Sequence, residues 1–157
     1  MFERTSTRLN SLLVELISGL LILLFTYAAI TKVAAFSTTL HEINNQVLPN
    51  WMTPYLAVAI PAAELLIVAG LLTRRYKLVA LYASLVLMAV FTVYIGLALL
   101  NVYSRMPCSC GGVLKNMGWR THFVFNLFYV AITLVAIKAV QKIQAAEAPA
   151  VQIHLAD

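Results

Sequence analysis

The residues whose type and spacing most directly suggest chemistry are Cys108 and Cys110, the two cysteines of the chain. They lie in the stretch MPCSCGG at residues 106–112. Two Cα atoms separated by two residues lie about 5.5–7 Å apart, which overlaps the window of about 4.4–6.8 Å that a disulfide tolerates. A ring this short restrains little of the unfolded chain, so structural stapling explains it poorly. A strained, exposed disulfide exchanges readily, as catalytic disulfides do, and the pair therefore favours thiol–disulfide exchange.

Nearby charged and sulfur-containing side chains help to distinguish redox exchange from metal binding by the two cysteines. Arg105, Lys115 and Arg120 would stabilise a thiolate and lower the pKa of the attacking cysteine. The thioethers of Met106 and Met117 would join two thiolates in a soft ligand set suited to Cu(I), which is a second interpretation. Zinc needs about four ligands, which C-x-C alone does not supply, so zinc is a weaker interpretation than copper and no residue is assigned as a metal ligand. Inert loop cysteines are the third interpretation.

Composition determines what must position this loop. The chain is 62% hydrophobic and 11% charged, with a mean hydropathy of +0.87, whereas soluble domains average about 45–50% and about 25%. A helix crosses a bilayer with roughly 20 apolar residues. Four such blocks are predicted as helices at about 11–31, 54–72, 78–101 and 121–140. We therefore expect an all-α, integral membrane four-helix bundle, a single domain over 1–157 with a cytoplasmic tail at 143–157.

The basic residues predict an orientation. Seven of the eleven Lys and Arg residues fall before the first helix, between the second and third, or from the last turn of the fourth onward. By the positive-inside rule, both termini are cytoplasmic and the cysteine loop is periplasmic in a bacterial inner membrane. This topology accounts for the net charge of +5, and the chain has no basic-aromatic patch, so we expect the lipid bilayer and no nucleic acid as a partner.

The loop after the first helix has its own pattern. Phe36, Leu40, Ile43 and Val47 recur at spacings of four, three and four, with polar residues between them. This pattern predicts a short amphipathic helix at the membrane surface, between the first two spanning helices. It either closes the bundle or forms a wall over the cysteine loop.

Polar residues within the spanning blocks are a second candidate site. Glu64 lies about ten residues into its block, hence about 15 Å deep, and should face the bundle interior either protonated or paired. Tyr27, Tyr94 and Asn126 occupy the outer half of the other helices, with Lys32 at the outer mouth. This polar column could carry protons or hold a quinone head group; the alternative is interhelical hydrogen bonding, worth about 0.6 kcal/mol per contact.

Three segments together show a family resemblance: YAAITK at residues 27–32, PAAELL at 61–66 and CSCGG at 108–112. Their order and spacing across four helices resemble the MauE branch of the DoxX-like membrane proteins. The resemblance implies a four-helix bundle, a thioredoxin-like periplasmic partner and disulfide formation in secreted enzymes, while DoxX-type relatives are named for a thiosulfate:quinone oxidoreductase subunit. It carries over Lys32, Glu64, Cys108 and Cys110 as site residues.

The sequence therefore predicts an inner-membrane thiol–disulfide redox protein, whose cysteine pair exchanges disulfides with a thioredoxin-like partner or a secreted redox enzyme. With no second cysteine pair, electrons would pass to a quinone or between two protein partners. Two alternatives stay open: a non-enzymatic membrane subunit or chaperone that docks a redox enzyme, and a Cu(I)-handling protein. Whether the chain is itself an enzyme is left open by the sequence.

Overall fold

The computed structural model describes residues 2–46, 49–100, 102 and 118–154, and these are almost entirely helical. The elements, in chain order, are α1 (Phe2–Ala34), α2 (Phe36–Asn44), η1 (Asn50–Met52), α3 (Thr53–Leu72), η2 (Arg74–Tyr76), α4 (Lys77–Leu99) and α5 (Trp119–His154). No strand occurs in these described segments. The predicted all-α class is confirmed.

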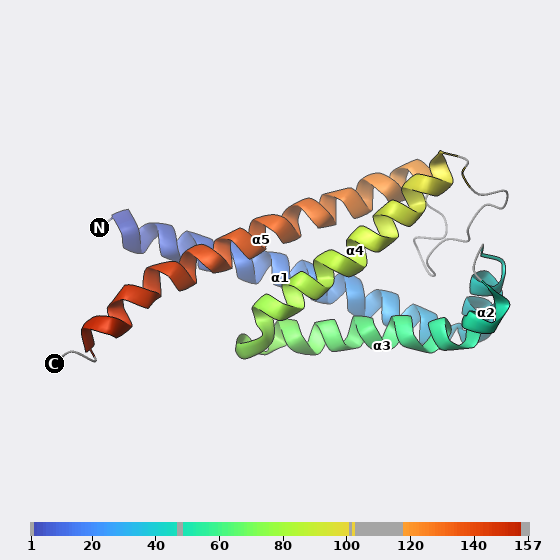
Figure 1. The fold of residues 1–157 in the computed structure, drawn as a ribbon, viewed down its shortest axis with the longest axis horizontal. Helices are drawn as coiled ribbons and strands as arrows, with labels where there is room; N and C mark the ends of the chain where they lie inside the picture. The colour runs from blue at the N-terminus through green and yellow to red at the C-terminus, as the bar shows by residue number, and fades with distance from the viewer. Residues whose placement is uncertain (1, 47–48, 101, 103–117, 155–157) are drawn as a thin grey trace.

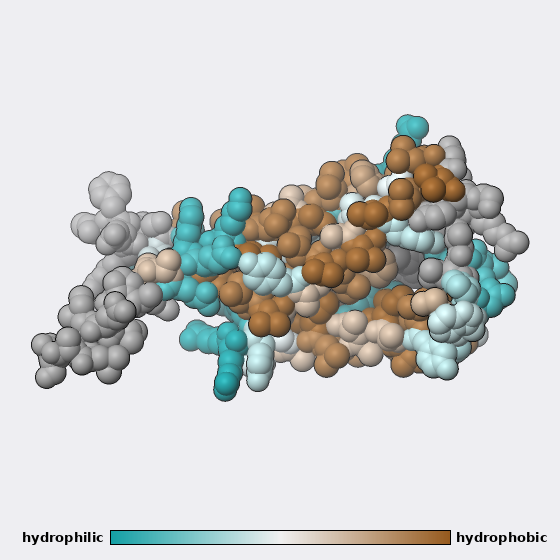
Figure 2. Space-filling view, viewed as in Figure 1, coloured by the Kyte–Doolittle hydropathy of each residue, from teal (hydrophilic) through white to brown (hydrophobic). Residues whose placement is uncertain are grey.

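Four of these helices are long and apolar enough to cross a membrane. The qualifying segments are Thr7–Ala34, Asn50–Leu72, Arg74–Leu99 and Arg120–Ala146. The predicted integral membrane four-helix bundle is thereby confirmed. Figure 2 shows the matching surface, a broad hydrophobic band between two more polar ends. Helix α5 continues well past the predicted end of its spanning block at residue 140, into the segment expected as a tail.

The helices pack as an antiparallel bundle (Figure 1). Helix α1 contacts α3 and α5, and α4 contacts α3 and α5. Both chain termini lie at one end of the bundle, at the left of Figure 1. Helix α2 lies at the opposite end, where α4 finishes and α5 starts. The chain segment that carries both cysteines therefore connects two helix ends on the α2 side.

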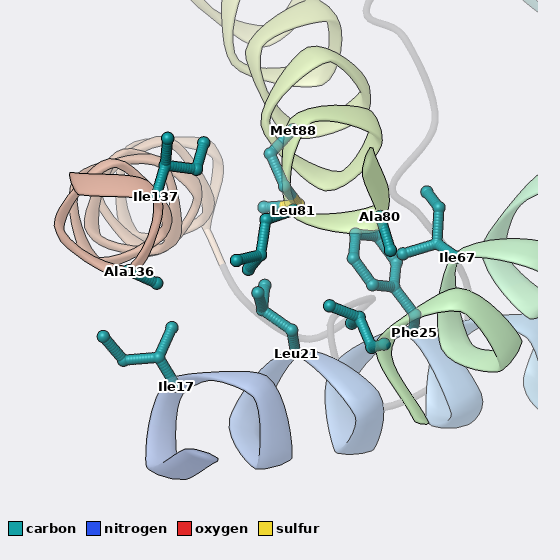
Figure 3. Packing of buried hydrophobic residues seen from close by; sticks show 10 residues of the cluster. Ile17, Leu21, Phe25, Ile67, Ala80, Leu81, Met88, Ala136 and Ile137 are labelled. Atoms are coloured by element: carbon teal, nitrogen blue, oxygen red, sulfur yellow. The ribbon is translucent and has the colours of Figure 1, made fainter. Parts of the chain in front are cut away.

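The centre of the bundle is an apolar cluster to which all four long helices contribute (Figure 3). Its buried members are Ile17, Leu21, Phe25, Ile67, Leu71, Ala80, Leu81, Met88, Ala136 and Ile137. Helices α3 and α4 approach closely at Gly70, because a Cβ added there would lie 2.8 Å from the Cβ of Ala80. Small residues at such crossings allow the van der Waals packing that associates helices in lipid.

The short helix α2 lies where the sequence predicts a surface helix, and its two buried residues are polar. Thr39 and Glu42 are buried, while Phe36 is exposed on the outer side. The Thr39 hydroxyl donates a hydrogen bond of 3.1 Å to the backbone carbonyl of Lys32. The last carbonyls of a helix have no partner within it, so Thr39 satisfies one of those at the end of α1. Helix α2 is thereby linked to the backbone of a predicted site residue.

Candidate functional site

A buried ion pair between Lys32 and Glu64 is the principal polar feature inside the bundle. Lys32 Nζ donates to Glu64 Oε1 at 2.6 Å, and the two side chains expose 9% and 2% of their surface. Lys32 Nζ also donates to the carbonyl of Ala28 at 3.3 Å, one turn earlier in α1. A charge removed from water is tolerated when it is paired and hydrogen-bonded. The structure thus shows the carboxyl of Glu64 paired across two helices.

The sequence places Glu64 in the bundle because of its position on α3. The buried positions of this helix are Thr53, Ala57, Pro61, Glu64, Ile67 and Leu71, which follow a helical repeat of three and four. Glu64 therefore falls on the stripe that faces α1. Pro61, one turn before it, has no N–H and so cannot donate to the carbonyl of Ala57.

The second carboxylate oxygen of Glu64 has no hydrogen-bond donor among the described residues. This Oε2 atom is buried. A cavity of about 30 Å³ lies beside the ion pair. Its lining is mostly apolar, with four polar side chains on it; the ten lining residues are Leu24, Phe25, Ala28, Lys32, Glu64, Met88, Phe91, His122, Phe125 and Asn126. A buried acceptor beside a cavity that polar side chains reach is the arrangement that binds a proton or a hydrogen-bond donor.

His122 is the site residue that the sequence analysis missed. It is 3% exposed and lies on α5, one helical turn before Asn126, which is 5% exposed. Both line the cavity from α5, while Lys32 and Glu64 line it from α1 and α3. The signal for His122 was present in the sequence, since it stands four residues before the Asn126 that was selected. Together we call Lys32, Glu64, His122 and Asn126 the polar cluster.

The other predicted column residues lie outside the cavity lining. Tyr27 is 37% exposed on the outer side of α1. Tyr94 of α4 donates its hydroxyl proton to Gln46 Oε1, beyond the end of α2. Each therefore contacts surroundings other than the cavity beside Glu64, and their functional roles remain predictions.

The predicted redox residues fall largely outside the part of the chain that the structure describes. Cys108, Cys110, Arg105 and Lys115 lie outside the described residues. Arg120 is described, and it is an exposed residue in the first turn of α5. The cysteine segment joins α4 to α5 at the end of the bundle where α2 lies (Figure 1). Lys32 in the last turn of α1 and His122 in the first turn of α5 lie toward the same end.

The size of the cavity bears on the quinone hypothesis, whereas the Cu(I) interpretation rests on residues outside the described part of the chain. The cavity has a volume of about 30 Å³, whereas an apolar cavity that binds a benzene ring measures about 150 Å³. The polar cluster as it stands does not fit a quinone head group. Among the described residues, no three His, Cys, Asp or Glu side chains lie close enough to hold a metal ion.

Comparison with known proteins provides the family. No curated relative and no solved structure matches the chain. The family model described as methylamine utilisation protein MauE matches residues 10–139. This range runs from the first spanning helix to the last and includes Lys32, Glu64, His122 and both cysteines. The chain belongs to the MauE family of membrane proteins.

Proposed function

We propose that this protein is a membrane thiol–disulfide exchange protein, in which Cys108 and Cys110 react with a thioredoxin-like partner. The observation that carries the proposal is the buried polar cluster, which extends inward from the end of the bundle that the cysteine segment connects. Ionisable residues within membrane-spanning helices are costly, and they commonly mark a functional site. A bundle held together by packing alone would not require them.

We propose a thiol–disulfide exchange that starts from a disulfide between Cys108 and Cys110. A partner thiolate attacks one sulfur of Cys108–Cys110, the intramolecular S–S bond breaks, and a mixed disulfide forms while the other cysteine leaves as a thiolate. The second partner thiol, once deprotonated, attacks the mixed disulfide and releases the reduced pair. The partner loses two electrons and two protons, and the pair gains them. Reoxidation requires a second protein disulfide of more oxidising potential.

The polar cluster is proposed to handle the protons of this reaction. Glu64 Oε2 accepts no hydrogen bond from a described residue, so a proton can be held there without breaking the 2.6 Å contact of Oε1 with Lys32. His122 lines the same cavity and has an imidazole, the side chain best suited to exchange protons near neutral pH. A cavity of about 30 Å³ can hold one water between them.

Electrons are proposed to leave through a second protein partner. The lining of the cavity does not fit a quinone, so no step is routed through one. The chain has two cysteines and hence no second pair for an internal relay. A shuttle between two partner proteins needs only the one pair.

The proposed location is the bacterial inner membrane, with both termini cytoplasmic and the cysteine segment periplasmic. The structure supports the underlying charge argument, because Arg74, Arg75 and Lys77 lie at the end that carries the termini (Figure 1). A periplasmic position would place the cysteines in an oxidising compartment. A membrane-impermeant thiol reagent added to intact spheroplasts should label reduced Cys108 and Cys110.

Capture of the mixed disulfide tests the proposal. With the resolving cysteine removed, the attacking cysteine should retain its partner, so either Cys108→Ser or Cys110→Ser should give a covalent adduct on a non-reducing gel. The adduct should disappear with dithiothreitol and should be absent from the double serine variant, which is the matched control. Absence of an adduct from both single variants, together with full function of the double variant, would favour the docking-subunit alternative.

A further inference from the structure

A second polar feature lies at the opposite end of the bundle, where α1, α4 and α5 converge beside η2. It is a cleft of about 340 Å³, within the range of about 300–1,000 Å³ typical of ligand sites. The lining combines three basic side chains, one carboxylate and an apolar wall; its residues are Ser11, Val14, Glu15, Arg74, Arg75, Lys77, Leu78, Val140, Ile143 and Gln144.

The charges of the cleft are unbalanced. Lys77 Nζ donates to Glu15 Oε1 at 2.6 Å, which uses the one carboxylate of the lining. Arg74 and Arg75 are exposed and have no carboxylate within 4.0 Å among the described side chains. The Arg75 guanidinium instead lies 6.0 Å from the centre of the Tyr76 ring. Two arginines are therefore available to an anion.

The position of the cleft limits what that anion can be. Arg74 is the first residue of the third candidate span, so the arginines stand at the end of an apolar helix. Val14, Leu78, Val140 and Ile143 give the same cleft an apolar side. The ligand that matches both parts carries an anion and an apolar body at the level of the lipid headgroups.

We propose that this cleft binds the phosphate of an anionic phospholipid. The guanidinium groups of Arg74 and Arg75 offer paired N–H donors to the phosphate oxygens, a geometry that arginine provides and lysine does not. The apolar side of the cleft covers the glycerol and the start of the acyl chains, which continue along the exposed aliphatic residues of the helices. A free phosphate ion would leave that apolar side in water. The site is independent of the cysteine chemistry.

Native mass spectrometry of the full chain in detergent tests the proposal, with phosphatidylglycerol, phosphatidylcholine and inorganic phosphate as separate probes. Wild type should retain phosphatidylglycerol over phosphatidylcholine. Arg74→Gln and Arg75→Gln should each weaken retention about tenfold, the effect of losing a hydrogen bond between charged groups. Arg8→Gln and Lys142→Gln remove the same charge at the same end from exposed residues outside the lining, and should change retention less than about twofold.

Three outcomes would overturn the proposal. Equal losses in the two control variants would mean a diffuse charge effect and no site. Retention of inorganic phosphate that depends on the arginines, without retention of lipid, would identify a free anion as the ligand. Unchanged binding in Arg75→Lys, which keeps the charge but not the fork of donors, would remove the role of guanidinium geometry. Unaltered circular dichroism and gel-filtration profiles show that each variant is folded.

Discussion

The two Lys–Glu pairs of this protein provide a matched experiment on the cost of a buried charge. Both pairs have an Nζ–Oε1 distance of 2.6 Å. Lys32 and Glu64 expose 9% and 2% of their side chains, whereas Lys77 and Glu15 expose 14% and 60%. Because the two contacts are equally short, a difference in the unfolding free energy lost on substitution reflects how deeply each pair is buried.

Removal of one residue of an ion pair should lower the unfolding free energy strongly only for the buried pair, Lys32 and Glu64. Lys32→Ala leaves both oxygens of Glu64 without a described partner, eleven residues into α3 and so about 16 Å from the start of that helix. We expect a loss of about 3–5 kcal/mol in unfolding free energy, as for other broken buried pairs. Glu64→Ala should cost less, about 3 kcal/mol at most, because Lys32 stands in the last turn of α1 and its long stem can reach the interface.

The control pair and the double variant complete the test. Lys77→Ala and Glu15→Ala should each cost about 1 kcal/mol or less, as at exposed pairs. Lys32→Met combined with Glu64→Leu should recover most of the stability lost in the single variants, because an apolar replacement strands no charge. The assay is reversible unfolding in mixed micelles, analysed as a double-mutant cycle. Equal costs for Lys32→Ala and Lys77→Ala would refute the assignment of a buried, structurally coupled pair.

Three further predictions concern other contacts. Gly70→Ala should destabilise the protein by about 1–3 kcal/mol, because the added Cβ would lie 2.8 Å from that of Ala80; Ala80→Gly should restore stability in the same unfolding assay, and a neutral Gly70→Ala would contradict the close approach. Thr39→Val should lower the unfolding free energy by about 1 kcal/mol in the same assay, since it removes the hydrogen bond to the carbonyl of Lys32. An unchanged unfolding free energy would show that other contacts hold α2 in place. His122→Gln should slow disulfide exchange about a hundredfold, if the imidazole transfers protons, with unfolding free energy changed by less than about 1 kcal/mol; parallel loss of stability and rate would assign His122 a packing role.

Much of the bundle was predictable because the bilayer allows few solutions. Apolar blocks of spanning length, separated by polar segments, predict the four long helices. Glu64 was predicted to face the interior, paired or protonated, and the structure shows the pairing. Its partner was harder to predict. Lys32 lies near the end of α1 and Glu64 deep in α3, so only the neighbouring packing of α1 and α3 and the length of a lysine side chain bring them together.

The features that the sequence did not predict depend on which face of each helix packs against the bundle. Tyr27 was placed by depth alone, yet the buried positions Leu21, Phe25 and Ala29 define a stripe that excludes it. His122 was not predicted as a site residue, although its spacing to Asn126 places both on one face of α5. Helix α2 buries Thr39, whose hydroxyl donates to a carbonyl at the end of α1, and helical periodicity alone does not predict such a tertiary contact.

The most direct test of the central claim is the redox behaviour of Cys108 and Cys110 themselves. Membranes that contain the oxidised protein are mixed with reduced thioredoxin, and free thiols are counted by the mass shift of a maleimide reagent. Thiol–disulfide exchange predicts that two thiols appear in this protein for each thioredoxin oxidised, reversibly on addition of oxidised glutathione. Two cysteines that react with maleimide to the same extent under all conditions would contradict the claim.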